Sequence, residues 1–218
     1  MSLLSPSQPE ETAQAETRQR LLEAAGEVFA EVGFRAATVR EICQRAGANV
    51  AAVNYHFGDK QRLYLEVLRY SYRLALEKYP LESGLPTGAP AEERLRAFVR
   101  SFLLRIFDKG RLAWRGRLIS REMVDPTGAL DALVKEEIQP QAEVLSAIVR
   151  QLAGRAASEE FIRSCSCSIV SQCVFYHHCQ PVICRLFPEQ RFGPEEIERL
   201  AGHITRFSLA ALQQMAKK

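Results

Sequence analysis

Hydrophobic residues recur along most of this chain at the spacing of an amphipathic helix. The first such segment starts at Thr17 and ends before Gly33, a residue that favours a helix stop. Its apolar positions fall three and four residues apart, on one helical face: Leu21, Leu22, Ala25, Val28, Phe29 and Val32. Neither a sustained period of two nor an Asn-Gly hairpin turn occurs. The pattern predicts an all-α fold.

Two short helices are expected after this segment. Thr38 followed three residues later by Glu41 is a capping box, which starts a helix that ends at Gly47. The second helix runs from about Val50 to His56, and a longer one starts near Asp59. The apolar residues of the two short helices are predicted to face inward: Val39, Ile42, Cys43, Ala46, Val50, Val53 and Phe57. Two short helices joined at a tight glycine turn are typical of a helix-turn-helix motif.

The rest of the chain shows the same helical pattern, interrupted by proline and glycine. The densest group of helix breakers lies at 79–90 and marks a boundary. Later breaks are expected at Gly110, Asp125-Pro126, Pro140, Gly154, Pro181, Pro188 and Gly193-Pro194. We therefore expect a disordered tail at 1–16, a three-helix helix-turn-helix domain at 17–63, and a helical ligand-binding and dimerisation domain at 64–218.

Composition adds few constraints. A net charge of +3 over 218 residues does not indicate nucleic-acid binding, so such a function depends on a local motif. The first residues lack the features of a signal peptide, and no apolar run is long enough to span a bilayer. We expect a cytoplasmic protein without membrane association, whose six cysteines stay as thiols.

The outward face of the second short helix is predicted to carry side chains that suit contact with DNA bases. Ala51 and Ala52 are small enough for close approach to the major groove, and their methyl groups can meet thymine methyls. Asn54 can donate and accept at once, as adenine recognition requires. An A-form RNA helix would not admit this helix into its deep, narrow major groove. The partner expected is double-stranded DNA.

The segments Thr38–Gly47, Val50–Phe57 and Asp59-Lys60 resemble the DNA-binding domain of the tetracycline-repressor (TetR) family, over about Arg18 to Leu68. The resemblance implies that Tyr55 and His56 reach phosphates, that Lys60 adds a charged phosphate contact, and that the start of the bracing helix touches DNA. Arg40 and Asn54 are the best candidates for reading the base sequence. The predicted DNA-binding residues are Thr38, Arg40, Asn49, Ala51, Ala52, Asn54, Tyr55, His56 and Lys60.

The later segments resemble the CecR-like branch of that family. The resemblance rests on Leu118–Met123 with Asp125–Thr127, on Glu137–Pro140, and on Ser168–Tyr176 with Pro181–Ile183. It implies a homodimer that senses a small molecule, with xenobiotics among the candidates. The apolar helices expected at about 158–180 and 195–215 are predicted to form the dimer interface. The alternative is that they only complete the core of the monomer.

A ligand pocket needs mostly apolar walls and a few polar anchors. The predicted walls are Phe102, Ile106, Trp114, Met123, Phe175 and Tyr176. Arg117 and His178 are the predicted anchors. Aromatic residues at helical spacing also make ordinary core, which is the alternative for each of them.

A group of cysteines and histidines invites a metal, redox or catalytic interpretation. It comprises Cys165, Cys167, Cys173, His177, His178, Cys179 and Cys184. Cys173 and His177 would share a helix face, but Cys-x-x-Cys and His-Glu-x-x-His are absent, as is a nucleophile elbow. We predict no metal, no cofactor and no enzyme, in preference to a cysteine hydrolase using Cys173 or Cys179. An all-α protein adaptor would leave the Thr38–Lys60 motif without a purpose.

The sequence therefore predicts a ligand-responsive transcription regulator. The expected mode is a repressor that binds a palindromic operator as a homodimer and is released by a small molecule.

Overall fold

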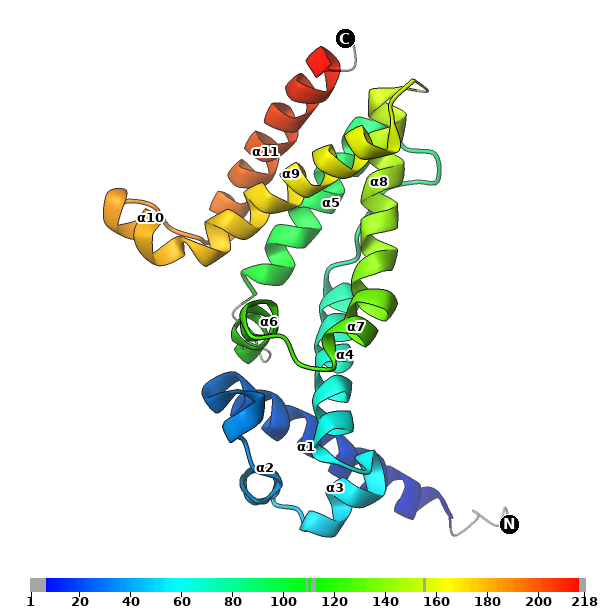
Figure 1. Cartoon of the computed structure of the whole chain (residues 1–218), viewed down its shortest axis with the longest axis vertical. Helices are drawn as coiled ribbons and strands as arrows, with labels where there is room; N and C mark the ends of the chain where they lie inside the picture. The colour runs from blue at the N-terminus through cyan, green and yellow to red at the C-terminus, as the bar shows by residue number, and fades with distance from the viewer. Residues whose placement is uncertain (1–6, 109, 111–112, 155, 216–218) are drawn as a thin grey trace, which may run out of the picture. The chain divides into compact units, whose positions relative to one another are not determined.

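The structure, a computed structural model, describes residues 7–108, 110, 113–154 and 156–215, and its regular structure there is entirely helical (Figure 1). The all-α prediction is confirmed. The helices are α1 Ser7–Ala36, α2 Val39–Ala46, α3 Val50–Phe57, α4 Lys60–Lys78, α5 Ala91–Ile106, α6 Trp114–Val124, α7 Leu130–Leu133, the π-helix η1 Val134–Ile138, α8 Gln139–Ala153, α9 Glu159–His178, α10 Gln180–Leu186 and α11 Pro194–Met215. None of the helices described has the length and apolar character to cross a membrane.

Helix α1 starts earlier than expected. The predicted disordered tail at 1–16 is wrong from Ser7 onward, because α1 begins there. The segment 10–16 is rich in alanine, glutamate and glutamine, which have high helix propensity and extend the helix. Residues 1–6 lie outside the described part. At the other end, Gly33 breaks the helix as predicted, with φ 83° and ψ 165°, before a last turn reaches Ala36.

The chain divides into two compact units that interleave along the sequence. The first unit comprises Met1–Leu74 and Gly110–Glu136, and the second comprises Ala75–Lys109 and Glu137–Lys218. Neither the boundary predicted after residue 63 nor the breakers at 79–90 separate them, because α4 passes from one unit into the other. Helix α6 falls in the first unit because it packs along α1.

The core of the first unit is built around α1. Six α1 side chains are inaccessible or nearly so, namely Leu21, Leu22, Ala25, Val28, Phe29 and Ala30. Val32, expected on the same face, is 42% exposed because the helix breaks at the next residue. Helices α2, α3 and α4 contribute Ile42, Cys43, Val53, Phe57, Leu63, Val67 and Leu68 to the buried set. Helix α6 closes the unit against α1.

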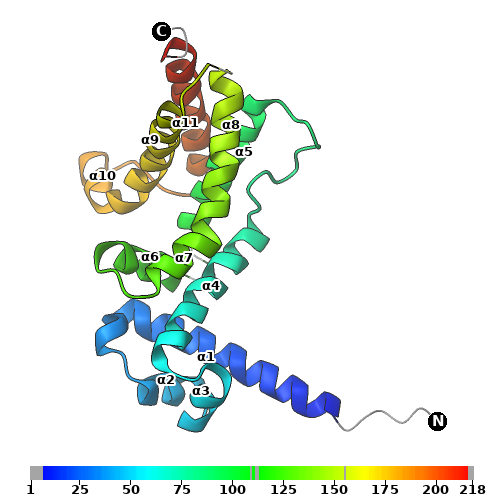
Figure 2. The same cartoon turned by 45° about the vertical axis from the view of Figure 1, so that its right-hand side comes forward.

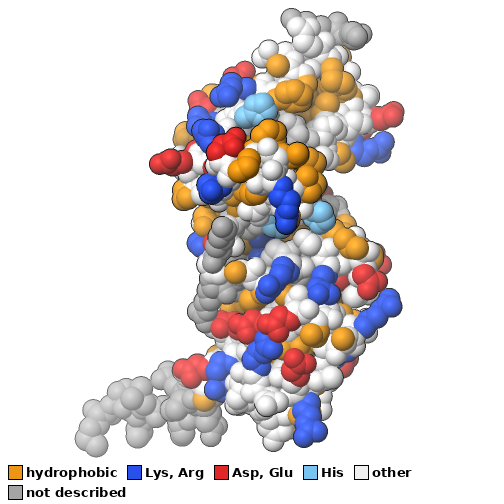
Figure 3. Space-filling model, turned by 90° about the vertical axis from the view of Figure 1, so that its left-hand side faces the viewer, with side chains coloured by type: hydrophobic (Ala, Val, Ile, Leu, Met, Phe, Trp, Pro, Cys, Tyr) orange, Lys and Arg blue, Asp and Glu red, His pale blue; other side chains and the backbone are white. Residues whose placement is uncertain are grey.

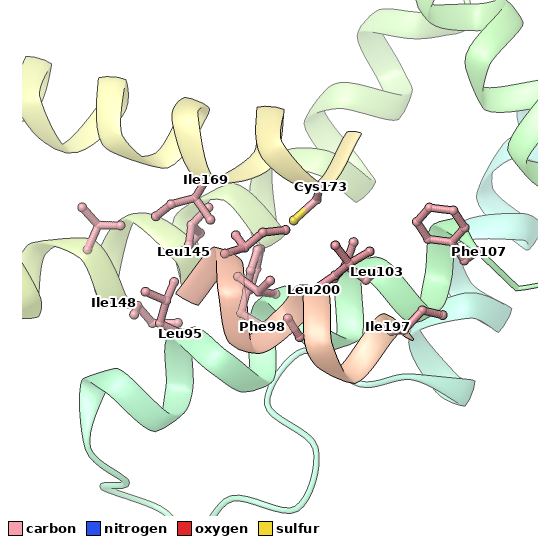
Figure 4. Close-up of a cluster of buried hydrophobic side chains, with 14 of the residues drawn as sticks. Leu95, Phe98, Leu103, Phe107, Leu145, Ile148, Ile169, Cys173, Ile197 and Leu200 are labelled. Atoms are coloured by element: carbon pink, nitrogen blue, oxygen red, sulfur yellow. The ribbon is translucent and has the colours of Figure 1, made fainter. Parts of the chain in front are cut away.

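The second unit is a helix bundle in which α5 packs against α8, α9 and α11 (Figures 1 and 2). Its core takes side chains from all four helices, as the close-up in Figure 4 shows: Leu95, Phe98, Leu103, Leu145, Ile148, Ile169, Cys173, Ile197 and Leu200. The helices expected at 158–180 and 195–215 are present as α9 and α11.

The predicted break at Pro140 is absent. Helical structure continues from α7 through the π-helix η1 into α8, with Pro140 in the first turn of α8. Proline has no backbone N–H and its ring collides with the carbonyl four residues earlier. The π-helical turn directly before α8 is wider than an α-helical turn and leaves room for the proline ring. The helix therefore continues through Pro140 with a local change of hydrogen-bond pattern.

Candidate nucleic-acid interface

Helix α2 has the caps that its sequence predicts. The Thr38 hydroxyl accepts a hydrogen bond from the Glu41 backbone N–H at 3.2 Å. At the other end Gly47 has φ 60° and ψ 42°, the left-handed conformation that glycine adopts without strain. Between the caps, Ile42, Cys43 and Ala46 are buried. These local interactions set the sharp turn that leads from α2 to α3.

Helix α3 starts at the far side of this turn. Asn49 is its N-cap, and its side-chain oxygen accepts a hydrogen bond from the Ala51 N–H at 3.0 Å. Val53 and Phe57 are buried, whereas Val50, predicted to point inward, is 45% exposed because it lies in the first turn. A capping role for Asn49 occupies the side-chain oxygen that a base contact would use.

The outward surface of α3 is mostly exposed, although the Tyr55 hydroxyl donates a hydrogen bond to the Gln14 side-chain oxygen of α1 at 3.4 Å. Ala51, Asn54 and Tyr55 are exposed, and Ala52 is half-buried. Asn54, like Arg40 at the start of α2, is exposed and makes no side-chain hydrogen bond to another described residue. Small, amide and guanidinium side chains that protrude without internal partners suit contact with base edges.

Tyr55 and His56 form an aromatic pair at the end of α3. Their ring centroids are 4.9 Å apart with a T-shaped arrangement, and Tyr55 is 71% exposed. Burial, and then the positive charge of Arg18, lower the pKa of His56 below its ordinary value. Arg18 itself lies over the Phe57 ring at 5.3 Å and pairs with Glu66 at 2.7 Å. At neutral pH His56 is therefore a neutral hydrogen-bonding group.

Lys60 has an internal role that the sequence prediction missed. Its Nζ donates to the backbone oxygens of Phe34 and Ala37 at 3.0 Å each and of Arg35 at 3.5 Å. It also lies 4.7 Å from the Phe34 ring centroid. An ammonium has three donors, and all three point at carbonyl oxygens. The predicted phosphate contact of Lys60 is therefore at odds with this geometry.

A second cation binds the same end of α1. Arg121, from α6, donates from Nε to the Ala30 oxygen at 3.1 Å and from Nη2 to the Glu31 oxygen at 2.9 Å. Glu31 in turn receives both terminal nitrogens of Arg45 from α2, each at 2.9 Å. No local sequence signal reveals the two contacts of Arg121, since their acceptors are main-chain carbonyls.

Glu122, the next residue of α6, is fully buried. Its carboxylate accepts hydrogen bonds from the Tyr64 hydroxyl at 2.7 Å, the Thr127 N–H at 2.9 Å and the Thr127 hydroxyl at 3.0 Å. Burial, and then the contact with Glu122, raise the pKa of Tyr64 far above its ordinary value. The Tyr64 ring also packs edge-on against Phe29 at 4.9 Å.

The predicted ligand-binding residues are divided between the two units. Trp114, Arg117 and Met123 belong to the first unit, where Trp114 is buried against α1 while Arg117 and Met123 are exposed. Phe102, Ile106, Phe175, Tyr176 and His178 belong to the second unit. There Phe175 and His178 face solvent, whereas Phe102, Ile106 and Tyr176 pack at the edge of the core. Trp114 is a core residue because Gly26 of α1 has no side chain and lets the indole ring pack against the helix.

The cysteine and histidine residues between 165 and 184 do not converge. Within the described residues, no three histidine, cysteine or acidic side chains are placed to hold a metal ion. Cys173 is buried, and burial raises the pKa of its thiol to about 12. A thiol with that pKa is protonated and a poor nucleophile at neutral pH.

Two family models match the chain. The one described as bacterial regulatory proteins of the tetR family matches residues 21–67. The one described as the C-terminal domain of the HTH-type transcriptional dual regulator CecR matches residues 91–212. The first match covers the second half of α1, all of α2 and α3, and the start of α4. The second runs from the start of α5 into α11.

Similar proteins fall in the same class. The dual regulator CecR of Shigella flexneri is 28% identical over 157 residues, which is 66% of this chain and 68% of that protein. The transcriptional activator FasR of Mycolicibacterium smegmatis is 38% identical over 87 residues, 40% of this chain and 39% of that protein. The crystal structure of PfmR, a TetR-family regulator from Thermus thermophilus, has the same fold, with a TM-score of 0.62 and 19% identity over 88% of this chain and 95% of its own.

Proposed function

This chain belongs to the TetR family of bacterial regulatory proteins and carries a CecR-type C-terminal domain, and from that premise we propose that it is a repressor released by a small molecule. It is a DNA-binding transcriptional regulator and not an enzyme. In our proposal it acts in the cytoplasm, as a homodimer on a palindromic operator.

The observation that carries the proposal is the exposed outward face of α3, on which the Asn54 side chain makes no hydrogen bond to another described residue. Asn54 protrudes beside Ala51 and Tyr55, while Val53 and Phe57 fix the opposite face in the core. A helix held in this way can enter the major groove and present its outward side chains to base edges. Arg40, exposed at the start of α2, is the second reading residue that we propose.

Dimerisation is supported by apolar side chains that the single chain leaves uncovered. In the second unit, several large hydrophobic residues are more than 40% exposed: Val174, Phe175, Val182, Leu186, Phe187, Phe207 and Met215. Figure 3 shows hydrophobic side chains gathered on one face of the second unit. Monomeric proteins rarely expose so many large apolar groups together. We assign α9 and α11 to a two-fold interface, which would place two α3 helices on the two halves of a palindrome.

For the effector we propose the second unit. Phe102, Ile106 and Tyr176 are half-buried at the edge of its core. The buried Arg105 lies 5.4 Å from the Phe102 ring centroid and hydrogen-bonds Gln141. Apolar walls with a few polar groups are what a small-molecule site needs. The proposal covers xenobiotics without choosing one.

The test is a titration of the purified protein onto the DNA upstream of its own gene and onto a scrambled duplex, at two salt concentrations. We expect tight binding to the first fragment only, with two chains per site, and inhibition of transcription from it. Asn54→Ala should lower the preference for the native fragment by about 1–3 kcal/mol. The exposed α2 variant Gln44→Ala is the matched control.

Weak, equal and strongly salt-sensitive binding to both fragments would mean that the operator lies elsewhere, and a selection from randomised duplexes would then locate it. Absence of binding at low salt would overturn the proposal. Activation of transcription would overturn the repressor assignment alone.

A further inference from the structure

The last turn of α6 contacts two other helices of the first unit through adjacent residues. Arg121 binds carbonyl oxygens of α1, and Glu122 binds the hydroxyl of Tyr64 on α4. Consecutive residues of a helix point about 100° apart, so neighbouring side chains reach different partners. Figures 1 and 2 both show α6 beside the carboxyl end of α1.

On the α1 side, the contact falls where α1 ends. The last carbonyls of a helix lack internal partners and carry the negative end of its dipole, so a cation there is stabilising. Arg121 takes the oxygens of Ala30 and Glu31, just before the break at Gly33. The planar guanidinium can donate to both oxygens at fixed angles, which an ammonium cannot do. Lys60 takes the oxygens beyond the break, up to Ala37, and α2 begins two residues later.

On the α4 side, the contact is a buried carboxylate. Glu122 is 0% exposed, and the three hydrogen bonds from Tyr64 and Thr127 are what offset the cost of burying its charge. Tyr64 is four residues after Lys60, so both lie on one face of α4. The first turns of α4 are therefore fixed to the end of α1 by Lys60 and to α6 by Tyr64.

Helices α2 and α3 lie in the chain between these two fixed points. We propose that Arg121 and Glu122 are positioning residues for DNA binding, which hold the end of α1 and the start of α4 at the separation that orients α2 and α3. The inference rests on the proposed DNA interface. It assigns a role to the Arg-Glu pair of α6, which that interface itself does not use.

The experiment uses the full-length chain and a duplex that the wild-type chain selects from a randomised pool. We expect Arg121→Gln to bind this duplex about tenfold or more weakly, at a temperature where the protein is fully folded, with an unchanged dependence of affinity on salt. Arg121→Lys should recover part of the affinity. Arg73→Gln is the control, because it removes an equal charge from an exposed α4 residue that makes no hydrogen bond to another described residue. It should bind within about twofold of wild type.

For the second residue, Glu122→Gln and the milder Tyr64→Phe should each weaken binding to the same duplex, by about fivefold or more. If the Glu122 variant does not fold, Tyr64→Phe still tests the role of Glu122, because it removes the hydrogen bond between the two residues. Hydrogen exchange gives a local readout: amides of 39–46 should exchange faster in Arg121→Gln, while those of α8 stay as in wild type. A uniform acceleration across the chain would show loss of stability alone and would overturn the inference.

The DNA-binding results separate a failure of the proposed function from a failure of the inference. If the wild-type chain selected no duplex, the proposed function would fall, and the inference with it. If the wild type binds and the Arg121 and Glu122 variants bind equally well, the inference alone is wrong. A lower affinity of Arg121→Gln with a salt slope smaller by about one would make Arg121 a phosphate contact, which also overturns it.

Discussion

Gly26 of α1 lies so close to Trp114 of α6 that a β-carbon at position 26 would sit 2.4 Å from the indole ring. Atoms do not approach that closely, so any other residue at 26 must displace the indole or move the helix. Because Trp114 is buried, the ring has no room to turn aside. This contact fixes how near α6 can lie to α1.

Gly26→Ala should therefore destabilise the protein. Alanine favours a helix by about 1 kcal/mol over glycine, but overpacking a core costs about 1–3 kcal/mol, and the rigid ring puts this site at the upper end. We expect a net loss of about 1–2 kcal/mol, measured by urea unfolding. Gly202→Ala in α11 is the control, since its β-carbon would meet only the end of Arg206, at 3.4 Å. A stabilised Gly26→Ala protein would contradict the contact.

Replacing Lys60 separates its two possible roles. If Lys60 holds the carbonyls at the end of α1, Lys60→Gln should lower the free energy of unfolding by about 1–2 kcal/mol and leave the salt dependence of DNA affinity unchanged. If it contacts a phosphate, the salt slope should fall by about one with little change in stability. Unfolding curves and DNA titrations at several salt concentrations decide between them. We expect the first result.

His56 should make the stability of the free protein depend on pH. Its pKa is lowered in the folded chain, so the fold favours the neutral imidazole. This contribution is present above the unfolded pKa of about 6.5 and is lost as the pH falls below it. Urea unfolding from pH 7.5 to 5.5 should show a smaller loss for His56→Gln than for wild type. His203→Gln, on an exposed α11 residue, should behave like wild type.

The buried thiol of Cys173 should make the stability of the protein depend on pH in the alkaline range. Its pKa of about 12 means that the folded chain keeps the proton while the unfolded chain loses it above about pH 9. Stability should fall there with rising pH, by up to about 1.4 kcal/mol per pH unit, and Cys173→Ala should reduce that slope. Cys167→Ala, at an exposed position, should not. Rapid alkylation of Cys173 at pH 7 would contradict its burial.

A charge on the uncovered face of α11 should dissociate the dimer. Phe207 is 61% exposed in the single chain, so Phe207→Glu costs little there but places a charge in the proposed interface. Sedimentation should give a dimer for wild type and a monomer for the variant, with DNA affinity reduced by at least about tenfold. Arg96→Glu, at an exposed position of α5, is the control. A dimeric Phe207→Glu protein would move the interface elsewhere.

The sequence predicts those parts of the structure that depend on neighbouring residues. The caps at Thr38 and Gly47 and the free side chain of Asn54 follow from local rules, and the structure contains all three. The partners of Lys60 and Arg121 could not be predicted, because they are carbonyl oxygens that only tertiary packing brings within reach. A lysine near a helix start looks the same whether it binds a phosphate or another helix.

The sequence left open whether Trp114 lines a pocket or belongs to the core, for a different reason. Its aromatic character fits a pocket as well as a core, and only its partner distinguishes the two. That partner has a signal in the sequence, since Gly26 lies in the middle of an amphipathic helix that alanine would favour. A glycine in such a place indicates a close approach by another element. The division into two interleaved units has no comparable signal.

The cations at the end of α1 bind main-chain oxygens, which every residue possesses. The side chains of Phe34 and Arg35 can thus be exchanged in related regulators without removing a carbonyl oxygen that Lys60 binds, whereas Lys60 and Arg121 supply donors that few residues could replace. These hydrogen bonds are therefore insensitive to substitutions at the α1 residues that supply the backbone oxygens. Regulators with these contacts could recognise different operators by changing the outward residues of α3, while Lys60 and Arg121 keep the same hydrogen bonds.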